Sequence, residues 1–389
     1  MCNFDQIIQR RGTNSYKWDT PERADVLPMW VADMDFQTAP CIISALQERV
    51  GHGIFGYTRV PQSYYESVAR WFSRRHQWLP ATEWMLYTSG VVPALSATIK
   101  ALTSRDDRVV VLTPVYNCFF SSIRNNGCMA SCSPLVQRDG NYRIDFDDLD
   151  SRTADPRAKL MLLCNPHNPG GRVWTRDELQ RVAAICRKNN VTVVADEIHC
   201  ELTFDGHDYT PFASVVPESQ LDQVVTCVSP SKAFNTAGLQ IATIIARSEE
   251  VRERIDRAIN INEVCDVNPF GIVATEAAYS AEGAEWLDEL RAYLWQNYLT
   301  LQKFFAERLP KFPVFQLEGT YLAWIDCSCV KGGGDRVAQQ LLSRERLMLS
   351  AGSMYGSEGA NFVRLNLACP RSVLLDALQR MERELAALV

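Results

Sequence analysis

The amino-acid sequence predicts an α/β fold in which a mainly parallel sheet lies between helices. Short apolar, β-branched runs alternate with stretches of helical periodicity through the middle of the chain, an order that is typical of βαβ units. After Pro269 the pattern changes to long helices and a few strands. The 389 residues suffice for one large domain and a smaller companion. We therefore expect a large α/β domain over residues 48–285 and a small α+β domain built from residues 1–47 and 286–389.

The first part of the chain is expected to contain little regular structure before its first helix. Residues 1–36 show almost no periodicity, and amphipathic helices are predicted to begin near Pro40 and, further on, to carry Val68 on a buried face. Between them, Gly51-His-Gly-Ile-Phe-Gly56 matches the letters of the dinucleotide-binding pattern G-x-G-x-x-G. No strand leads into this run, so we interpret it as a loop.

The central sheet is expected to have seven strands. The runs that predict them cover residues 84–88, 108–113, 129–136, 159–164, 191–195, 222–228 and 240–245. Thr175 and Glu178 form a capping box, which predicts that a helix begins there.

The last third of the chain is expected to be mainly helical. Helices are predicted over 272–279 and, at regular apolar spacing, from Trp286 to Phe305. Strands at 314–317, 321–326 and 362–368 and a terminal helix complete the set. We interpret Gly332-Gly-Gly334 as a plain turn, because no partner residues of a phosphate-binding loop accompany it.

Composition and charge exclude several classes of function. The net charge of −6 offers no basic excess for nucleic acid. No apolar run approaches membrane-spanning length and no secretory signal is recognisable, so we expect a cytoplasmic protein with no membrane partner. The 13 cysteines are scattered, and neither paired C-x-x-C motifs nor H-E-x-x-H occur. We therefore expect reduced thiols and no metal site.

Lys232 is the first candidate for a catalytic residue. It follows the predicted 222–228 strand, at the edge where α/β proteins bind their ligands, and Ser229 and Ser231 flank it. A lysine that acts as a nucleophile needs a lowered pKa, which burial and a cationic neighbour provide. Alone, this short pattern fits an exposed loop lysine better, so the argument depends on residues upstream.

Three other predicted strands end in polar or aromatic residues, namely Tyr116, Asn165 and Asp196. A cofactor with an aldehyde, a pyridine ring and a phosphate would need such a set. Lys232 would bind its aldehyde, Asp196 would pair with its ring nitrogen and Tyr116 would stack on the ring. Asn165 would bond the phenolic oxygen.

The phosphate of such a cofactor would need donors at a helix N-terminus. Gly90 stands at a predicted strand-to-helix turn, where backbone N–H groups can approach an anion. The expected phosphate site consists of the N–H groups of Gly90, Val91 and Val92 with the hydroxyls of Ser229 and Ser231.

Each residue also has a plainer interpretation when it is taken alone. Tyr116 could be ordinary packing at the edge of the core, and Asp196 could only cap a helix. His199 could be a structural histidine whose nitrogens are satisfied. The order and spacing of the whole set favour the cofactor site.

With these motifs the chain resembles pyridoxal-phosphate enzymes of the class I/II aminotransferase fold (fold type I). The matching motifs are Ser89-Gly-Val-Val92, Pro114-Val-Tyr116, Asn165-Pro-His-Asn-Pro-Gly170, Asp196-Glu-Ile-His199, Ser229-Pro-Ser-Lys232 and Arg364-Leu-Asn366. Further motifs are similar to the cystathionine β-lyase (MalY/PatB) branch: Leu27-Pro-Met-Trp-Val-Ala-Asp-Met-Asp-Phe36, Phe55-Gly-Tyr57 and Gly319-Thr-Tyr-Leu-Ala-Trp324.

The resemblance implies pyridoxal 5'-phosphate as cofactor, an amino-acid substrate and a homodimer with shared active sites. It implies that Tyr57 reaches the phosphate of the neighbouring subunit's cofactor and contacts substrate, and that Asn165 contributes to substrate binding as well. Arg364 would bind the substrate α-carboxylate, and Lys232 would move protons. Aminotransferases usually carry tyrosine where His199 stands, so His199 is expected near the cofactor with its role open.

The expected function is a cysteine-S-conjugate β-lyase that acts on cystathionine or a related thioether and releases pyruvate, ammonia and a thiol. One alternative is an aminotransferase that uses the same site. A second is a regulatory protein that keeps the fold and binds a transcription factor, which the presence of Lys232 makes less favoured.

Overall fold

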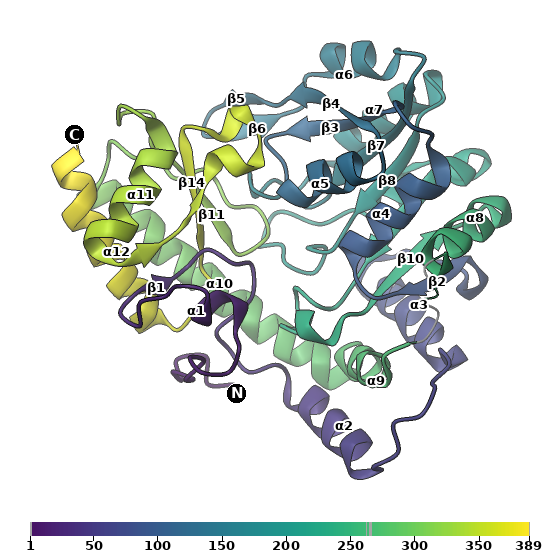
Figure 1. Cartoon of the computed structure of the whole chain (residues 1–389), viewed down its shortest axis with the longest axis horizontal. Helices are drawn as coiled ribbons and strands as arrows, with labels where there is room; N and C mark the ends of the chain where they lie inside the picture. Colours follow the sequence, from purple (N-terminus) through teal and green to yellow (C-terminus); the bar gives the residue numbers. More distant parts are fainter. Residues whose placement is uncertain (1, 262, 264–266, 389) are drawn as a thin grey trace.

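The computed structural model describes residues 2–261, 263 and 267–388. A seven-stranded sheet of order β2-β10-β9-β8-β7-β3-β4 forms its centre (Figure 1). Its strands are β2 (Met85–Thr88), β3 (Arg108–Thr113), β4 (Met129–Pro134), β7 (Ala158–Cys164), β8 (Thr192–Asp196), β9 (Val224–Val228) and β10 (Ala242–Ala246). Strands β4, β3, β7, β8 and β9 are parallel, and β10 pairs antiparallel with β9 and β2. The predicted, mainly parallel sheet is therefore confirmed.

Helices cover both faces of this sheet. Alternate residues of a strand point to opposite faces, so Val110 of β3 packs with α6 (Phe146–Thr153) and α7 (Arg176–Lys188). Val111 packs on the other side with α4 (Val91–Leu102), α5 (Asn117–Asn125) and α8 (Glu249–Asn260). The capping box of Thr175 and Glu178 begins α7 as predicted.

Both ends of the chain form the rest of the molecule. The N-terminal elements are α1 (Tyr16–Asp19), β1 (Leu27–Pro28), α2 (Pro40–Gly51) and α3 (Gln62–His76). The C-terminal elements are α9 (Pro269–Ala278), α10 (Ala281–Arg308), β11 (Leu322–Asp326), α11 (Gly333–Glu345), β12 (Leu347–Met348), β13 (Ser350–Ala351), β14 (Phe362–Asn366) and α12 (Arg371–Leu388). Strand β1 pairs with β12, and β11, β14 and β13 form a three-stranded sheet. The domain boundaries at residues 47 and 285 stay a prediction.

Three predicted details differ from the structure. Residues 314–317 form only an isolated bridge, Val314 to Ile325, and the predicted 129–136 strand divides before β5 (Val136–Arg138), which pairs with β6 (Asn141–Arg143). The glycine run is not a plain turn, because α11 begins at Gly333. A Cβ at Gly334 would lie 1.8 Å from the carbonyl oxygen of Phe362, so glycine is required where this helix meets β14.

Among the described helices, none combines the length and apolar character that crossing a bilayer requires.

Candidate active site

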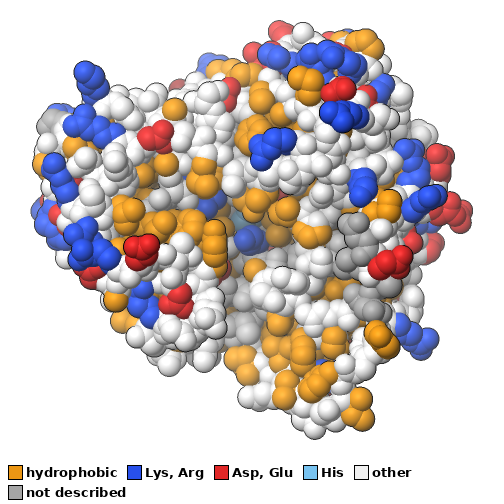
Figure 2. All heavy atoms as spheres, in the orientation of Figure 1, with side chains coloured by type: hydrophobic (Ala, Val, Ile, Leu, Met, Phe, Trp, Pro, Cys, Tyr) orange, Lys and Arg blue, Asp and Glu red, His pale blue; other side chains and the backbone are white. Residues whose placement is uncertain are grey.

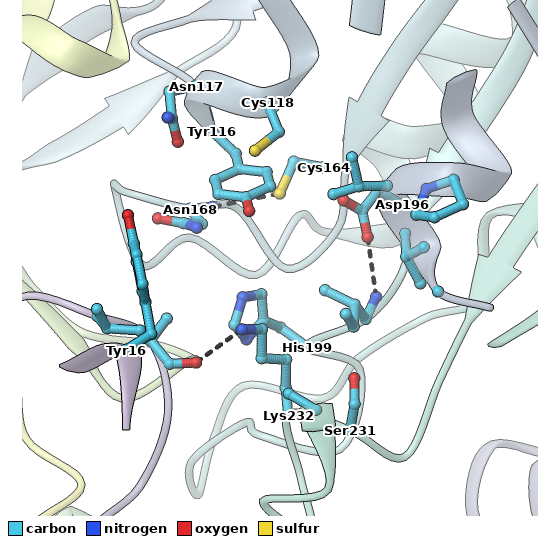
Figure 3. Close-up of a pocket in the computed structure, with 18 of the residues that line it drawn as sticks. Tyr16, Tyr116, Asn117, Cys118, Cys164, Asn168, Asp196, His199, Ser231 and Lys232 are labelled. Carbon is cyan, nitrogen blue, oxygen red and sulfur yellow. Dashed lines mark hydrogen bonds between the residues drawn. The ribbon is translucent and has the colours of Figure 1, made fainter. Parts of the chain in front are cut away.

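A cavity of about 420 Å³ lies at the carboxyl ends of the parallel strands. The loops after β2, β3, β7, β8 and β9 line it, and segments from both chain ends cover it. The space-filling view shows a hollow on this face of the molecule, with hydrophobic side chains around it (Figure 2). Figure 3 shows that Tyr116, Asp196, His199 and Lys232 point toward the same space. The predicted convergence of the strand ends is thus present.

Lys232 projects into this cavity from the loop after β9. Its Nζ donates a hydrogen bond of 2.6 Å to the carbonyl oxygen of Ala32 (Figure 3). Burial and the nearby Arg364 guanidinium lower the pKa of Lys232 to about 8. A substantial fraction of the amine is therefore neutral, and nucleophilic, near physiological pH.

Asp196 is the last residue of β8 and is only 3% exposed. Its Oδ1 accepts a 3.2 Å hydrogen bond from the backbone N–H of Ile198, and no ion pair to it occurs among the residues that the structure describes. Burial raises the pKa of this carboxyl group to about 7. A buried carboxylate without a cation is costly, so this position favours a cationic ligand group.

The N-terminus of α4 supplies the expected anion site. Gly90 precedes its first turn, and Gly90, Val91 and Val92 all line the cavity together with Ser231. The prediction for Ser229 differs from the structure. Its hydroxyl donates to the carbonyl oxygen of Ile241 at 2.6 Å and accepts from the N–H of Ser231, and it is not part of the cavity wall.

The prediction for Asn165 also needs correction. Its Nδ2 donates to Glu197 Oε1 at 3.1 Å and to the carbonyl oxygen of Thr210 at 3.0 Å, and the residue does not line the cavity. Cys164 does line it, and successive side chains of a strand point to opposite sides. The amide that reaches the cavity is Asn168, from the same motif.

Tyr116 and His199 occupy opposite parts of the cavity wall (Figure 3). Burial raises the pKa of Tyr116 well above its ordinary value, so its hydroxyl stays protonated. Burial lowers the pKa of His199, and Lys232 and Arg364 lower it further, so the imidazole is neutral. Its Nδ1 has no partner among the described residues, and its ring meets that of Tyr321 edge-on at 6.1 Å. His199 therefore lines the cavity, and its Nδ1 is buried without a hydrogen-bond partner among the described residues.

Arg364 lies on β14 and is 5% exposed. Its Nη1 donates to Asn168 Oδ1 at 3.0 Å, and its Nη2 donates to the carbonyl oxygen of Trp30 at 2.9 Å. The guanidinium stacks over the ring of Tyr355 at 4.9 Å. These contacts hold its planar fork at the cavity wall.

Tyr57 does not contribute to the cavity of its own chain. It lies in the loop between α2 and α3 and is 96% exposed, beside Ile54 and Phe55, which are also exposed.

Several cavity residues were not assigned a site role from the sequence. All but Asn168 come from the two chain ends, and they are Tyr16, Trp30, Ala32, Asn168, Met354 and Tyr355. Asn168 could have been found, since it lies in the Asn165–Gly170 motif.

Among the described residues, one group of potential metal ligands occurs, and it lies outside this cavity. Ligand atoms of His76, Cys200 and Glu201 lie within 4.8 Å of one another. Both Glu201 oxygens already accept hydrogen bonds, Oε1 from His76 and Trp71 and Oε2 from Arg75. The group thus has the character of an ion-pair cluster.

Comparison with known proteins gives consistent similarities. The model of the family Aminotransferase class I and II matches residues 24–381. Cystathionine beta-lyase PatB of Bacillus subtilis is 41% identical over 388 residues, covering 99% of this chain and 100% of that protein. Protein MalY of Escherichia coli is 33% identical over 380 residues, with 96% of each covered.

Solved structures agree. Cystalysin from Treponema denticola, which contains a pyridoxal 5'-phosphate cofactor, superposes with a TM-score of 0.96 at 34% identity, covering 100% of both chains. The pyridoxal-phosphate-bound C-S lyase from Staphylococcus hominis superposes with a TM-score of 0.92 at 33% identity, covering 99% of both chains.

Proposed function

Because this chain belongs to the aminotransferase class I and II family, we propose that it is a pyridoxal-phosphate-dependent carbon–sulfur β-lyase. Its substrates would be cystathionine or related cysteine S-conjugates, and its products pyruvate, ammonia and a thiol. The observation that carries the proposal is that one cavity holds both Lys232, an amine of lowered pKa, and Asp196, a buried carboxyl group with no ion-pair partner among the described residues. The named activities of the similar proteins select the reaction class.

Pyridoxal phosphate fits the residues present. The buried carboxyl group of Asp196 matches a protonated ring nitrogen, and the α4 N-terminus with Ser231 matches a phosphate. Tyr116 offers an aromatic face, and Lys232 an amine for the aldehyde. When bound there, the cofactor supplies an electron-withdrawing ring that stabilises negative charge at the substrate Cα.

The chain's own residues then bind the substrate and move its proton. Arg364 binds the α-carboxylate, for which its two terminal nitrogens at the cavity wall are suited. Lys232 Nζ in its neutral form takes the proton from the substrate Cα, since its pKa of about 8 is close to the working pH.

The elimination balances as follows. The Cα–H bond and the Cβ–S bond break, and the sulfur leaves with its electron pair as a thiolate. One water molecule is consumed as the three-carbon remainder becomes pyruvate and ammonia.

We also propose that the active unit is a homodimer with shared sites. The loop with Ile54, Phe55 and Tyr57 exposes apolar side chains that a monomer would leave in water. Since Tyr57 is remote from its own cavity, it is available to reach the cofactor phosphate in a second copy of this chain.

Product analysis tests the reaction class. With cystathionine or an S-alkyl cysteine, pyruvate, ammonia and thiol should appear in equal amounts with no keto acid added. If turnover requires a keto acid and yields a new amino acid without ammonia, the protein is an aminotransferase and the lyase proposal fails.

A further inference from the structure

The stretch Trp30–Phe36, called here the 30–36 segment, lines the cavity with its first three residues and accepts hydrogen bonds from both Lys232 and Arg364. Most of its carbonyl oxygens accept hydrogen bonds from side chains, because the segment is not a strand. Trp30 O accepts from Ser350 at 3.0 Å as well as from Arg364. The side chain of Asn366 donates to Val31 O and Asp33 O, each at 2.6 Å.

Two residues of the active site are among these donors. Ala32 O accepts from Lys232 Nζ at 2.6 Å and from Tyr321 Oη at 3.0 Å. Trp30 O accepts from Arg364 Nη2 at 2.9 Å. A displacement of the 30–36 segment would therefore move the acceptors of the catalytic amine and of the carboxylate-binding guanidinium together.

A cluster of four charged residues lies beside the segment, with Lys17 and Asp35 buried and Arg10 and Asp33 half-buried. Its members, called here the ion network, are Arg10, Lys17, Asp33 and Asp35. The side chain of Lys17 is 0% exposed, and its Nζ lies 2.8 Å from Asp35 and 3.6 Å from Asp33. Arg10 pairs with Asp33 and with Asp35 at 2.7 Å each, and it also donates to Met34 O at 3.0 Å.

The ion network also reaches the mouth of the cavity. Trp30 Nε1 donates to the carbonyl oxygen of Lys17 at 3.3 Å. Tyr16, the residue before Lys17, lines the cavity, and its ring lies 5.3 Å from that of Trp30. The backbone of Lys17 is thus fixed to the same segment as its ammonium group.

Stability alone is a poor explanation for this arrangement. Buried ion pairs can often be replaced by apolar side chains with little loss of stability, because desolvation opposes their attraction. Such a network instead fixes the orientation of its members, since each charged group must face its partners at hydrogen-bond distance. Here the directed contacts end on the segment that bonds Lys232 and Arg364.

We propose that the ion network sets the position of the 30–36 segment, and that Lys17 is a positioning residue for the active site. Through this segment, the ion network determines where the carbonyl oxygens that accept hydrogen bonds from Lys232 and Arg364 lie. The inference rests on the roles proposed above for these two residues.

The test compares Lys17→Met with Arg23→Met in the purified, cofactor-loaded protein. Arg23 is a matched control from the same region, because its ion pair with Asp25 is exposed and its side chain makes no hydrogen bond to the described residues of the 30–36 segment. In Lys17→Met the KM for a cysteine S-conjugate, and the dissociation constant of an unreactive amino-acid analogue, should rise about tenfold, the scale of one lost hydrogen bond. The pH midpoint of the cofactor's visible absorbance should shift. Arg23→Met should leave all three at wild-type values.

Folding is checked by circular dichroism. If Lys17→Met does not fold, Arg10→Gln and Arg10→Lys replace it, since the Arg10 side chain is 21% exposed and tolerates substitution more readily. Arg10→Gln should show the same changes, and Arg10→Lys should restore part of the wild-type behaviour.

The proposal is overturned if these variants lower the melting temperature but leave KM, analogue binding and the pH midpoint unchanged. That result would show a role in stability only. Failure of the proposed function is distinguishable, since in that case wild-type protein would yield no pyruvate, while analogue binding and the absorbance midpoint would still report on the ion network.

Discussion

The Nζ atom of Lys232 donates to the carbonyl oxygen of Ala32 at 2.6 Å, across 200 residues of sequence. This bond joins the carboxyl end of β9 to the N-terminal segment that covers the cavity. The amine of Lys232 is therefore oriented by a part of the chain outside the central sheet. The reactivity of Lys232 thus depends on both the central sheet and the N-terminal segment.

The first prediction concerns the pH dependence of cofactor attachment. An amine attacks an aldehyde only when it is neutral, and burial together with Arg364 lowers the pKa of Lys232 to about 8. In cofactor-free protein the rate of cofactor attachment should rise as the pH increases through about 8. Arg364→Met removes a positive neighbour, which raises the pKa of Lys232 and should move the curve to higher pH.

Borohydride reduction identifies the residue. Peptide mapping after reduction should find the cofactor on Lys232, and Lys232→Ala should remain unlabelled. Label on another lysine would contradict the assignment.

The second prediction concerns Asp196. Asp196→Asn should bind the cofactor more weakly and lose several kcal/mol of transition-state stabilisation, about a hundredfold or more in rate, because the ring nitrogen loses its anionic partner. Steady-state kinetics and cofactor titration measure both effects. A near-normal rate would exclude this role for the carboxyl group.

The same substitution should have the opposite effect on the cofactor-free protein. Burial raises the pKa of Asp196 to about 7, so the folded state favours the protonated form. The free energy of unfolding therefore falls as the pH rises from about 4 through 7, because the unfolded chain loses this proton more readily than the folded one. Without cofactor, Asp196→Asn should thus melt at a higher temperature than wild type at pH 8, and the difference should vanish near pH 4.

The positions of the site residues show what the sequence could predict. Lys232, Asp196, Tyr116 and Gly90 lie at strand ends or at a strand-to-helix turn, and the parallel sheet gathers these ends at one edge. Their convergence follows from local patterns alone.

The errors arose within single loops. Asn165 and Asn168 stand in one motif, and the first still belongs to the β7–β8 pairing, since its N–H donates to the carbonyl oxygen of Asp196. Its side chain consequently points away from the cavity. Ser229 and Ser231 also differ. The Ser229 hydroxyl accepts a hydrogen bond from the backbone N–H of Ser231 within the turn, and only Ser231 lines the cavity.

The covering residues could not be predicted by any local argument. Ala32 contributes a backbone carbonyl, for which side-chain chemistry gives no signal, and Tyr321 meets it from 289 residues away. Such contacts depend on how the chain ends pack over the sheet. Only tertiary structure reveals them.

The third prediction tests whether active sites are shared between subunits. Tyr57→Phe and Lys232→Ala should each lower activity strongly when present alone. When the two variants are mixed under conditions that exchange subunits, activity should partly return, since each hybrid contains one site with both native residues. Mixtures no more active than their components, or a fully active monomer in sedimentation, would contradict sharing.

The last prediction concerns Glu201, a buried residue that does not line the cavity. It is 4% exposed, and its carboxylate accepts hydrogen bonds from Trp71, Arg75 and His76. Burial alone would raise its pKa, but His76 and Arg75 outweigh burial and lower the pKa to about 2. Glu201→Gln removes the buried anion from Arg75, which keeps only its 2.9 Å pair with the exposed Asp288, and should cost about 3 kcal/mol in the free energy of unfolding at pH 7.

Because the folded-state pKa is lowered, the stability that Glu201 contributes is complete above about pH 4.5 and is lost as the pH falls toward 2. Urea unfolding should therefore show a large difference between wild type and Glu201→Gln at pH 7 and a smaller one at pH 3. Glu66→Gln is the matched control, since Glu66 is exposed and its 3.4 Å pair with Arg70 should contribute less than about 1 kcal/mol. If Glu201→Gln and Glu66→Gln unfold alike at pH 7, the buried carboxylate does not stabilise the fold in this way.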